Sequence, residues 1–215
     1  MRIEINPEHP EPRKIARAVH ALRSGECIAY PTDTVYGLGC SIDDKHAIES
    51  LYLMKQMPRT QPLALVVPDL SGISRFAVVQ DFHYRFIKRL VPGPYTFILE
   101  ATREVPKLLM MKRKTIGIRV PAHPIPVALA KELGAAIVST TASHPADGEE
   151  ALQDPDVIDD RFPTLTMVLD GGWGAVDPST VIDLTTQEPR LVRAGAGMDL
   201  IEQAFGMRRP FEADE

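Results

Sequence analysis

Apolar positions along the chain alternate between two periods, one typical of helices and one typical of strands. Ile15, Val19 and Leu22 recur at helical spacing, so they share one face of a helix that Pro12 can open and Gly25 can end. Short apolar or β-branched runs bounded by Gly and Pro instead predict strands. The strands expected from these runs lie at 27–30, 63–67, 95–99, 115–120, 136–140, 167–169, 180–184 and 190–193.

Further helices separate these strands. Asp43 or Asp44 can cap a helix whose Ala47, Ile48 and Leu51 face inward, and other helices are expected near 82–90, 124–133 and 198–205. Residues 143–163 are rich in Pro, Asp and Glu and predict a surface excursion with one helical turn. The pattern therefore predicts an α/β fold, one domain over residues 1–208, with a mixed sheet of about seven strands. The acidic residues 209–215 predict a disordered tail.

Composition narrows the class of protein. The chain has 215 residues, of which 44% are hydrophobic and 25% charged, as in ordinary globular proteins. No apolar run reaches the roughly 20 residues of a membrane span, and the N-terminus lacks a signal-peptide pattern, so a cytoplasmic protein is expected. The net charge of −5 argues against strong non-specific nucleic-acid binding, although Lys112–Arg113–Lys114 and Arg208–Arg209 are short basic runs.

The cysteines and histidines form no metal-binding motif. Cys27 and Cys40 are the two cysteines, and neither CxxC nor Cys/His ligand spacing is present. Cys27 lies in an apolar run and is expected to be a buried small hydrophobe, while Cys40 is a candidate reactive thiol. A disulfide is not expected in a cytoplasmic chain of this size.

Residues 29–40, AYPTDTVYGLGC, are the most informative stretch of the chain. An apolar strand meets Pro31, two hydroxyls flank a carboxylate at Thr32–Asp33–Thr34, and two glycines follow. Such a loop at the end of a strand suits a small-molecule site at the rim of a sheet. A strand-to-helix turn in which Thr and Asp cap backbone amides explains the same residues equally well. The loop alone does not decide between the two.

Hydroxyls or an arginine also follow several other predicted strands. Arg119, the run Ser139–Thr140–Thr141, Ser179 and Arg193 each stand at or just beside the end of one. The planar fork of Arg and the short donors of Ser and Thr suit phosphate or carboxylate ligands. No GxxxxGK[ST], GxGxxG or GxSxG motif is present, so the common nucleotide-binding loops and the hydrolase elbow are excluded. Taken singly, each of these residues is explained as well by a salt bridge or a turn cap.

Four motifs together resemble the YrdC/YciO family. They are YPTDTVYGLGC, PGPYTFIL (92–99), TIGIRVPAHP (115–124) and PSTVIDL (178–184) followed by VRAG, in the order that the family has them and over nearly the whole chain. The resemblance implies a three-layer α/β fold with a twisted mixed sheet around a large cleft. It also implies a nucleotidyltransferase that makes threonylcarbamoyl-AMP from ATP, L-threonine and bicarbonate, releasing pyrophosphate, for the threonylcarbamoyl modification of tRNA.

The resemblance also assigns residues to ligands. Thr34, Arg119 and Ser179 would hold L-threonine, with Arg119 on its carboxylate. The ATP site, with Mg²⁺ bound to the nucleotide, would be lined by Lys55, Thr115, Thr141 and Arg193. No protein nucleophile is implied, because the carbamate formed from threonine and bicarbonate attacks the α-phosphate itself. Catalysis would then rest on positioning and charge neutralisation.

Two positions depart from the pattern of the family's active synthases and match the YciO branch. Lys-x-Arg is replaced by Lys55–Gln56–Met57, although Arg59 is close enough to serve the same phosphate, and Ser-x-Asn is replaced by Thr141–Ala142–Ser143. A lost charge-assisted phosphate contact costs about 1.5–3 kcal/mol, or roughly tenfold to more than a hundredfold in rate. Weak synthase activity is therefore expected. The alternative is a protein of the same fold that binds double-stranded RNA or tRNA with little or no turnover.

Overall fold

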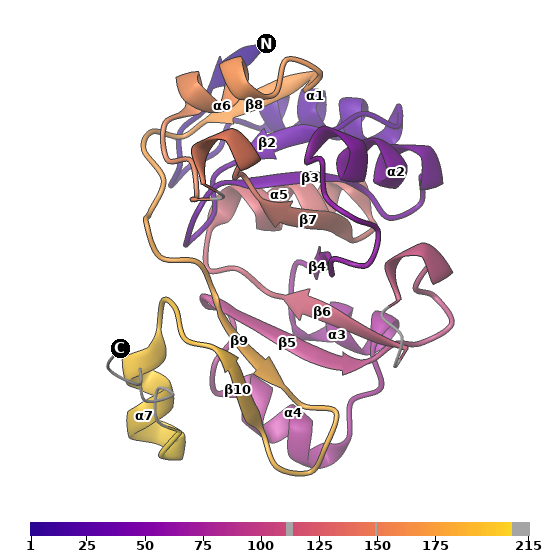
Figure 1. Ribbon diagram of the computed structural model, residues 1–215, viewed down its shortest axis with the longest axis vertical. Helices are drawn as coiled ribbons and strands as arrows, with labels where there is room; N and C mark the ends of the chain where they lie inside the picture. Colours follow the sequence, from indigo (N-terminus) through magenta and orange to yellow (C-terminus); the bar gives the residue numbers. More distant parts are fainter. Residues whose placement is uncertain (111–113, 149, 208–215) are drawn as a thin grey trace.

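The computed structural model describes residues 1–110, 114–148 and 150–207. The acidic tail and the basic residues Lys112, Arg113, Arg208 and Arg209 lie outside this part of the chain. Within it, strands and helices alternate around one sheet, as Figure 1 shows. No helix in the described part is long and apolar enough to cross a membrane.

Ten strands in the described residues form a single mixed sheet, in the order β1-β8-β2-β3-β7-β4-β6-β5-β9-β10. The pairs β1–β8, β2–β8, β4–β6 and β5–β9 are parallel and the remaining pairs are antiparallel. The strands are β1 (Arg2–Glu4), β2 (Ile28–Tyr30), β3 (Gly37–Ser41), β4 (Ala64–Val66), β5 (Tyr95–Glu100), β6 (Thr115–Arg119), β7 (Ile137–Thr141), β8 (Met167–Asp170), β9 (Thr180–Asp183) and β10 (Arg190–Arg193).

The predicted α/β class and mixed sheet are confirmed, but the predicted count of about seven strands is wrong. β1 has three residues and lies largely exposed, so it carries no apolar run that a pattern could detect. β3 contains Gly37 and Gly39, and glycine is disfavoured in strands because it adds chain entropy and no packing. Its pairing with β2 and β7 makes it a strand nonetheless.

All of the predicted helices are present, with the expected caps. They are α1 (Pro12–Arg23), α2 (Lys45–Met54), α3 (Leu70–Phe76), α4 (Asp81–Lys88), α5 (Pro124–Leu133), α6 (Pro155–Arg161) and α7 (Met198–Phe205), with 3-10 turns η1 (Lys107–Leu109) and η2 (Pro145–Asp147). Asp44 caps α2 by accepting from the Ala47 amide at 2.9 Å, and Gly134 ends α5 at a φ of 73°. The pattern missed α3, and the 143–163 excursion holds α6 as well as the turn η2.

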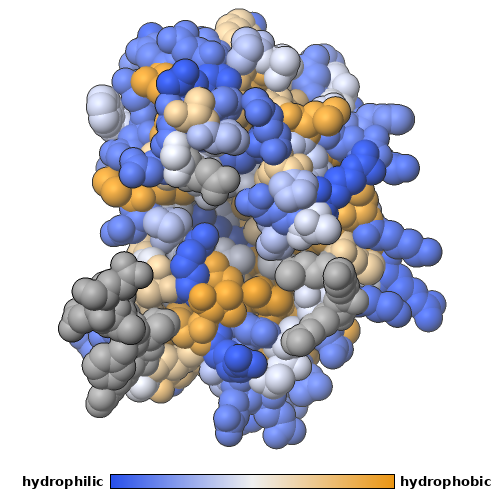
Figure 2. Space-filling view, viewed as in Figure 1, coloured by the Kyte–Doolittle hydropathy of each residue, from blue (hydrophilic) through white to orange (hydrophobic). Residues whose placement is uncertain are grey.

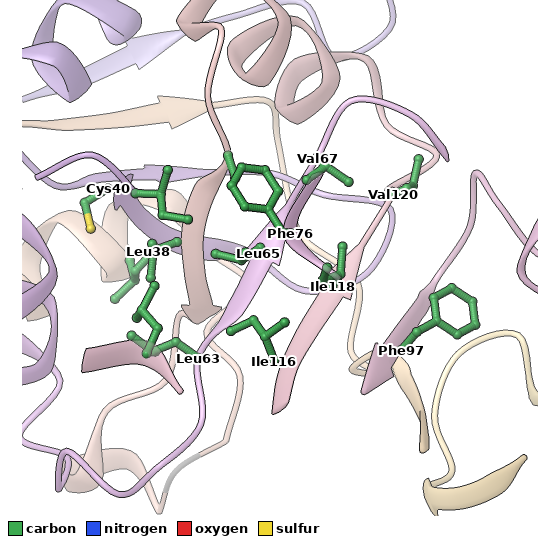
Figure 3. Packing of buried hydrophobic residues seen from close by; sticks show 14 of the residues in the cluster. Leu38, Cys40, Leu63, Leu65, Val67, Phe76, Phe97, Ile116, Ile118 and Val120 are labelled. Carbon is green, nitrogen blue, oxygen red and sulfur yellow. The ribbon is translucent and has the colours of Figure 1, made fainter. Parts of the chain in front are cut away.

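Helices pack on both faces of the sheet and create two hydrophobic clusters. One cluster joins α1 and α5 to β2 and β8 through residues such as Leu22 and Leu129. The larger cluster joins the opposite face to α2, α3, α4 and α6, and Figure 3 shows its strand residues Leu38 on β3, Leu65 on β4 and Ile118 on β6. The fold is thus three-layered, and α1 and α5 cover only one end of the sheet.

Candidate active site

One face of the central strands carries small side chains instead of an apolar layer. The strand register places Gly39 beside Ser139, Ser139 beside Ala64, Ala64 beside Gly117 and Gly117 beside Ile98. Ala64 and Ile98 are half-buried and belong to neither hydrophobic cluster. Tyr30 and Ile137 pack over Gly39. The open face, defined by the other four residues, offers a floor on which a ligand can lie. In Figure 2 the surface is hollowed near the middle of the molecule, at the level of β4 and β6.

Arg119 joins the informative loop to the end of β6. Its side chain points to the same side of the sheet as Gly117, because strand residues alternate and Ile118 lies in the larger cluster. The Arg119 Nη2 donates to Thr34 Oγ1 at 2.7 Å and to the Asp33 carboxylate. Thr34 is fully buried and Arg119 is 9% exposed. The structure therefore brings together two of the three residues expected to bind threonine.

The remaining donors of Arg119 point to a missing acceptor. Its Nε is buried and has no hydrogen-bond partner in the described part of the chain. Leaving a buried donor unpaired costs about 1–3 kcal/mol, and more when the group is charged. A ligand oxygen does not reach Nε in this conformation, because the atom is closed to solvent. Nη1 makes no hydrogen bond in the described residues and is not buried, so a carboxylate or phosphate oxygen can pair with it beside Thr34.

Ser179 and Arg193 form a second group of donors nearby. Arg193 donates to the Ser179 carbonyl from Nε at 3.2 Å and from Nη2 at 2.8 Å. The Ser179 hydroxyl lies 2.9 Å from the Thr96 hydroxyl. Burial, and after it the positive charge of Arg119, lowers the pKa of Arg193. The two guanidinium groups therefore influence each other, and a bound anion would relieve their repulsion.

The residues expected to line the ATP site are only partly brought together. Lys55 follows α2 and its Nζ donates to the hydroxyl of Ser143 at 2.7 Å and to the Ser143 carbonyl. Thr141 ends β7, two residues before Ser143 and opposite the start of β3. Thr115 is buried but lies at the end of β6 remote from Arg119.

Arg59 and Met57 lie apart from these donors. The Arg59 side chain is 63% exposed and pairs with Glu49 of α2, with 3.5 Å between Nη2 and Oε1. Met57 is partly buried against the larger cluster. In this conformation Arg59 therefore points toward α2 and away from the other residues expected to bind ATP.

Three further polar groups lie at the site, and no motif in the sequence indicated a role for them. Asp33 pairs with Arg119, Thr96 contacts Ser179, and the buried Tyr30 hydroxyl lies 2.6 Å from the Ser139 hydroxyl. Burial raises the pKa of Tyr30 to about 12, so this hydroxyl stays protonated. Tyr30 and Thr96 could have been identified as candidates, because they occupy alternate strand positions. Once the register is known, such positions point to the same side of the sheet as the open face.

Cys40 does not have the properties of a nucleophile at this site. Cys40 is fully buried, and contact with Cys27 together with burial raises the pKa of its thiol above the usual range. The candidate reactive thiol is therefore a core residue. His123 accepts from the Ile125 amide at 3.2 Å, and burial lowers its pKa while Asp33 opposes that shift. In the described residues no group of three His, Cys, Asp or Glu side chains is placed to hold a metal.

Comparison with known proteins assigns the chain to a family. The family model described as "Sua5_yciO_yrdC: Telomere recombination" matches residues 20–195. The chain belongs to this Sua5/YciO/YrdC family. The uncharacterized protein YciO of Escherichia coli strain K12 is 43% identical over 195 residues, which cover 90% of this chain and 94% of YciO. The crystal structure of E. coli YciO superposes with a TM-score of 0.87 over 92% of this chain and 96% of that one.

Relatives of known activity are more distant within the same family. The threonylcarbamoyl-AMP synthase of Chromobacterium violaceum is 36% identical over 180 residues, covering 83% of this chain and 92% of the synthase. The crystal structure of P. abyssi Sua5 complexed with L-threonine is 28% identical, with a TM-score of 0.88. That alignment covers 96% of this chain and 61% of the Sua5 chain. The resemblance to this family and the three-layer α/β fold are thus confirmed.

Proposed function

We propose that the protein is a nucleotidyltransferase of the threonylcarbamoyl-AMP synthase type, acting on ATP, L-threonine and bicarbonate. The observation that carries the proposal is the Arg119 guanidinium, which Thr34 and Asp33 hold by Nη2 while Nη1 stays accessible and without a hydrogen bond in the described residues, within electrostatic reach of Arg193. The family relation to a threonylcarbamoyl-AMP synthase and to a Sua5 bound to L-threonine supports the choice of substrate. The product would serve the threonylcarbamoyl modification of tRNA.

The amino acid would bind where the two donor groups meet. Arg119 would take the threonine carboxylate through its Nη1, and Thr34 and Ser179 would contribute hydroxyls beside it. Both hydroxyl groups are nearly or fully buried, so little water competes for them. A buried charge-assisted pair is worth more than one in water because the local dielectric constant is lower.

ATP would lie on the same face, with Lys55 and Arg193 neutralising its phosphates and Thr115 and Thr141 lining the site. Arg59 would have to leave Glu49 to join them, and its 63% exposed side chain leaves room for that rotation. Mg²⁺ would arrive with the nucleotide, since this ion is commonly held by substrate phosphates and few protein carboxylates.

The chemistry then follows from the positions of the reactants. Threonine and bicarbonate condense to a carbamate and water, and a carbamate oxygen attacks the α-phosphorus of ATP as pyrophosphate leaves. The protein supplies no nucleophile; Lys55 and Arg193 stabilise charge that develops on the phosphates. Met57 supplies no such charge, so we expect turnover below that of relatives with Lys-x-Arg. Binding of double-stranded RNA or tRNA stays a prediction of the family resemblance.

Pyrophosphate release from ATP tests this function. We expect release that requires both L-threonine and bicarbonate, and that falls by at least a hundredfold in Arg119→Ala because a charged substrate contact is lost. Arg103→Ala, which removes an exposed arginine from the loop after β5, is the matched control and should retain activity. Release that ignores threonine, or that survives Arg119→Ala, would exclude the proposed reaction.

A further inference from the structure

Asp33 connects the loop after β2 to the loop after β6. One oxygen of its carboxylate accepts from Arg119 Nη2, and the other accepts from the Ala122 amide at 2.9 Å. The side chains of Asp33 and Arg119 are each 11% exposed, so this pair is largely shielded from water. A buried pair of this kind holds its geometry, because breaking it would leave an uncompensated charge.

The contacts of Arg119 are all made by one end of its guanidinium. Thr32 Oγ1 at 3.3 Å, the Asp33 carboxylate and Thr34 Oγ1 at 2.7 Å all accept from Nη2. Nη2 carries two N–H groups, so three acceptors saturate it. The Nε of the same group is closed to solvent, whereas Nη1 is not buried and has no partner in the described residues. Asp33 and the two threonines thus occupy Nη2 and leave Nη1 for a ligand.

Asp33 also sets the charge of the site. Burial lowers the pKa of Arg193, and the positive charge of Arg119 lowers it further, so the two arginines interact unfavourably. One carboxylate offsets one of these two positive charges. The remaining single charge matches a substrate carboxylate of charge −1. Without Asp33, two uncompensated cations would share the site and Arg119 would be free to turn toward solvent.

We propose that Asp33 is a positioning residue, which holds the Arg119 guanidinium by Nη2 so that its accessible Nη1 meets the carboxylate of the amino-acid substrate. The inference rests on the proposed function for the identity of that substrate. Asp33 itself does not touch the substrate; it acts through Arg119. An asparagine cannot replace it, because the Ala122 amide and Arg119 both require an acceptor and the amide group offers only one.

The test measures L-threonine affinity by calorimetry and steady-state kinetics with Asp33→Asn. We expect threonine to bind about tenfold to a hundredfold more weakly, because a charge-assisted contact that orients Arg119 is lost. The KM for ATP should change by less than about threefold, since the phosphates are expected to bind Lys55 and Arg193. Asp43→Asn, an exposed acid beyond the other end of β3, is the matched control and should leave both constants unchanged.

A double variant separates positioning from direct contact. If Asp33 acts only through Arg119, then Arg119→Ala with Asp33→Asn should bind threonine no more weakly than Arg119→Ala alone. Should Asp33→Asn fail to fold, Asp33→Glu carries the test, because it keeps the charge and both acceptors but displaces them. We expect Asp33→Glu to weaken threonine binding while its far-UV circular dichroism stays that of the wild type.

The possible results distinguish this inference from the proposed function. Equal threonine affinity in the wild type and in Asp33→Asn would overturn the positioning role and leave the function standing. Threonine binding that depends on Asp33, without any pyrophosphate release, would support the positioning role and contradict the proposed function. A wild-type protein that binds no threonine would contradict both.

Discussion

Individual side chains at this site combine two kinds of information. Arg119, Thr34 and Ser179 could be picked from the sequence because hydroxyls and arginines follow predicted strands and match family motifs. Asp33 stands between two of these residues in the sequence, yet its partner is 86 positions away. A pattern read locally therefore marks the residue as polar but does not reveal that it orients a guanidinium.

Met57 is the single residue at which we expect activity to increase. Met57→Arg restores the Lys-x-Arg arrangement, and one charge-assisted phosphate contact is worth about 1.5–3 kcal/mol. Pyrophosphate release should therefore rise by about tenfold or more, measured at saturating ATP and threonine. The cost in stability is small, because Met57 is only partly buried.

Gln56→Arg is the matched control for this variant. It adds the same charge at an exposed neighbouring position and should leave the rate within about twofold of the wild type, as surface changes usually do. Equal acceleration by both variants would mean that added positive charge, and not a specific phosphate contact, limits the reaction.

At the scale of elements, the glycines of β3 and β6 differ in what they make room for. A Cβ on Gly39 would lie 2.7 Å from Ile137 Cγ2 and 2.8 Å from the Val138 carbonyl oxygen. A Cβ on Gly117 would meet Thr96 Cγ2 at 3.3 Å and Ala64 Cβ at 3.5 Å, which neighbours can accommodate. Gly39 thus permits close packing of its neighbours, whereas Gly117 leaves space on the open face that a side chain would otherwise fill.

Alanine at these two positions should separate stability from binding. We expect Gly39→Ala to lower the free energy of unfolding by about 1–3 kcal/mol, because overpacking forces neighbouring atoms to move. Gly117→Ala should change it by less than about 1 kcal/mol and instead weaken ligand binding. Urea denaturation and threonine calorimetry on both variants provide the comparison. A destabilised Gly117→Ala with normal affinity would contradict the role of the open face.

At the scale of the whole molecule, the sheet buries both cysteines on the face opposite the candidate site. Cys27 and Cys40 are 4% and 0% exposed, in the layer that joins β3 to α2. The cysteines are therefore placed to report on opening of the fold as a whole, since a thiol in this layer meets solvent only when the layer separates.

Alkylation by iodoacetamide should follow global unfolding. We expect intact-mass spectrometry to find no adduct on the native protein and two adducts after denaturation in guanidinium chloride. The raised pKa of Cys40 also disfavours its reactive thiolate. Rapid labelling of either thiol in the native protein, at the rate of a free thiol, would contradict the packing described for β2 and β3.

The sequence by itself determined the class of fold, most helices with their caps, and the residue types of the site. These features depend on local periodicity, on turn chemistry and on motifs that stand together in the chain. The tertiary structure alone decided that Gly37–Ser41 is a strand, that Asp33 pairs with Arg119 and that Cys40 is buried in the core. Each of these depends on contacts between segments distant in the chain, and a β ladder places such segments together without leaving a local signal in either.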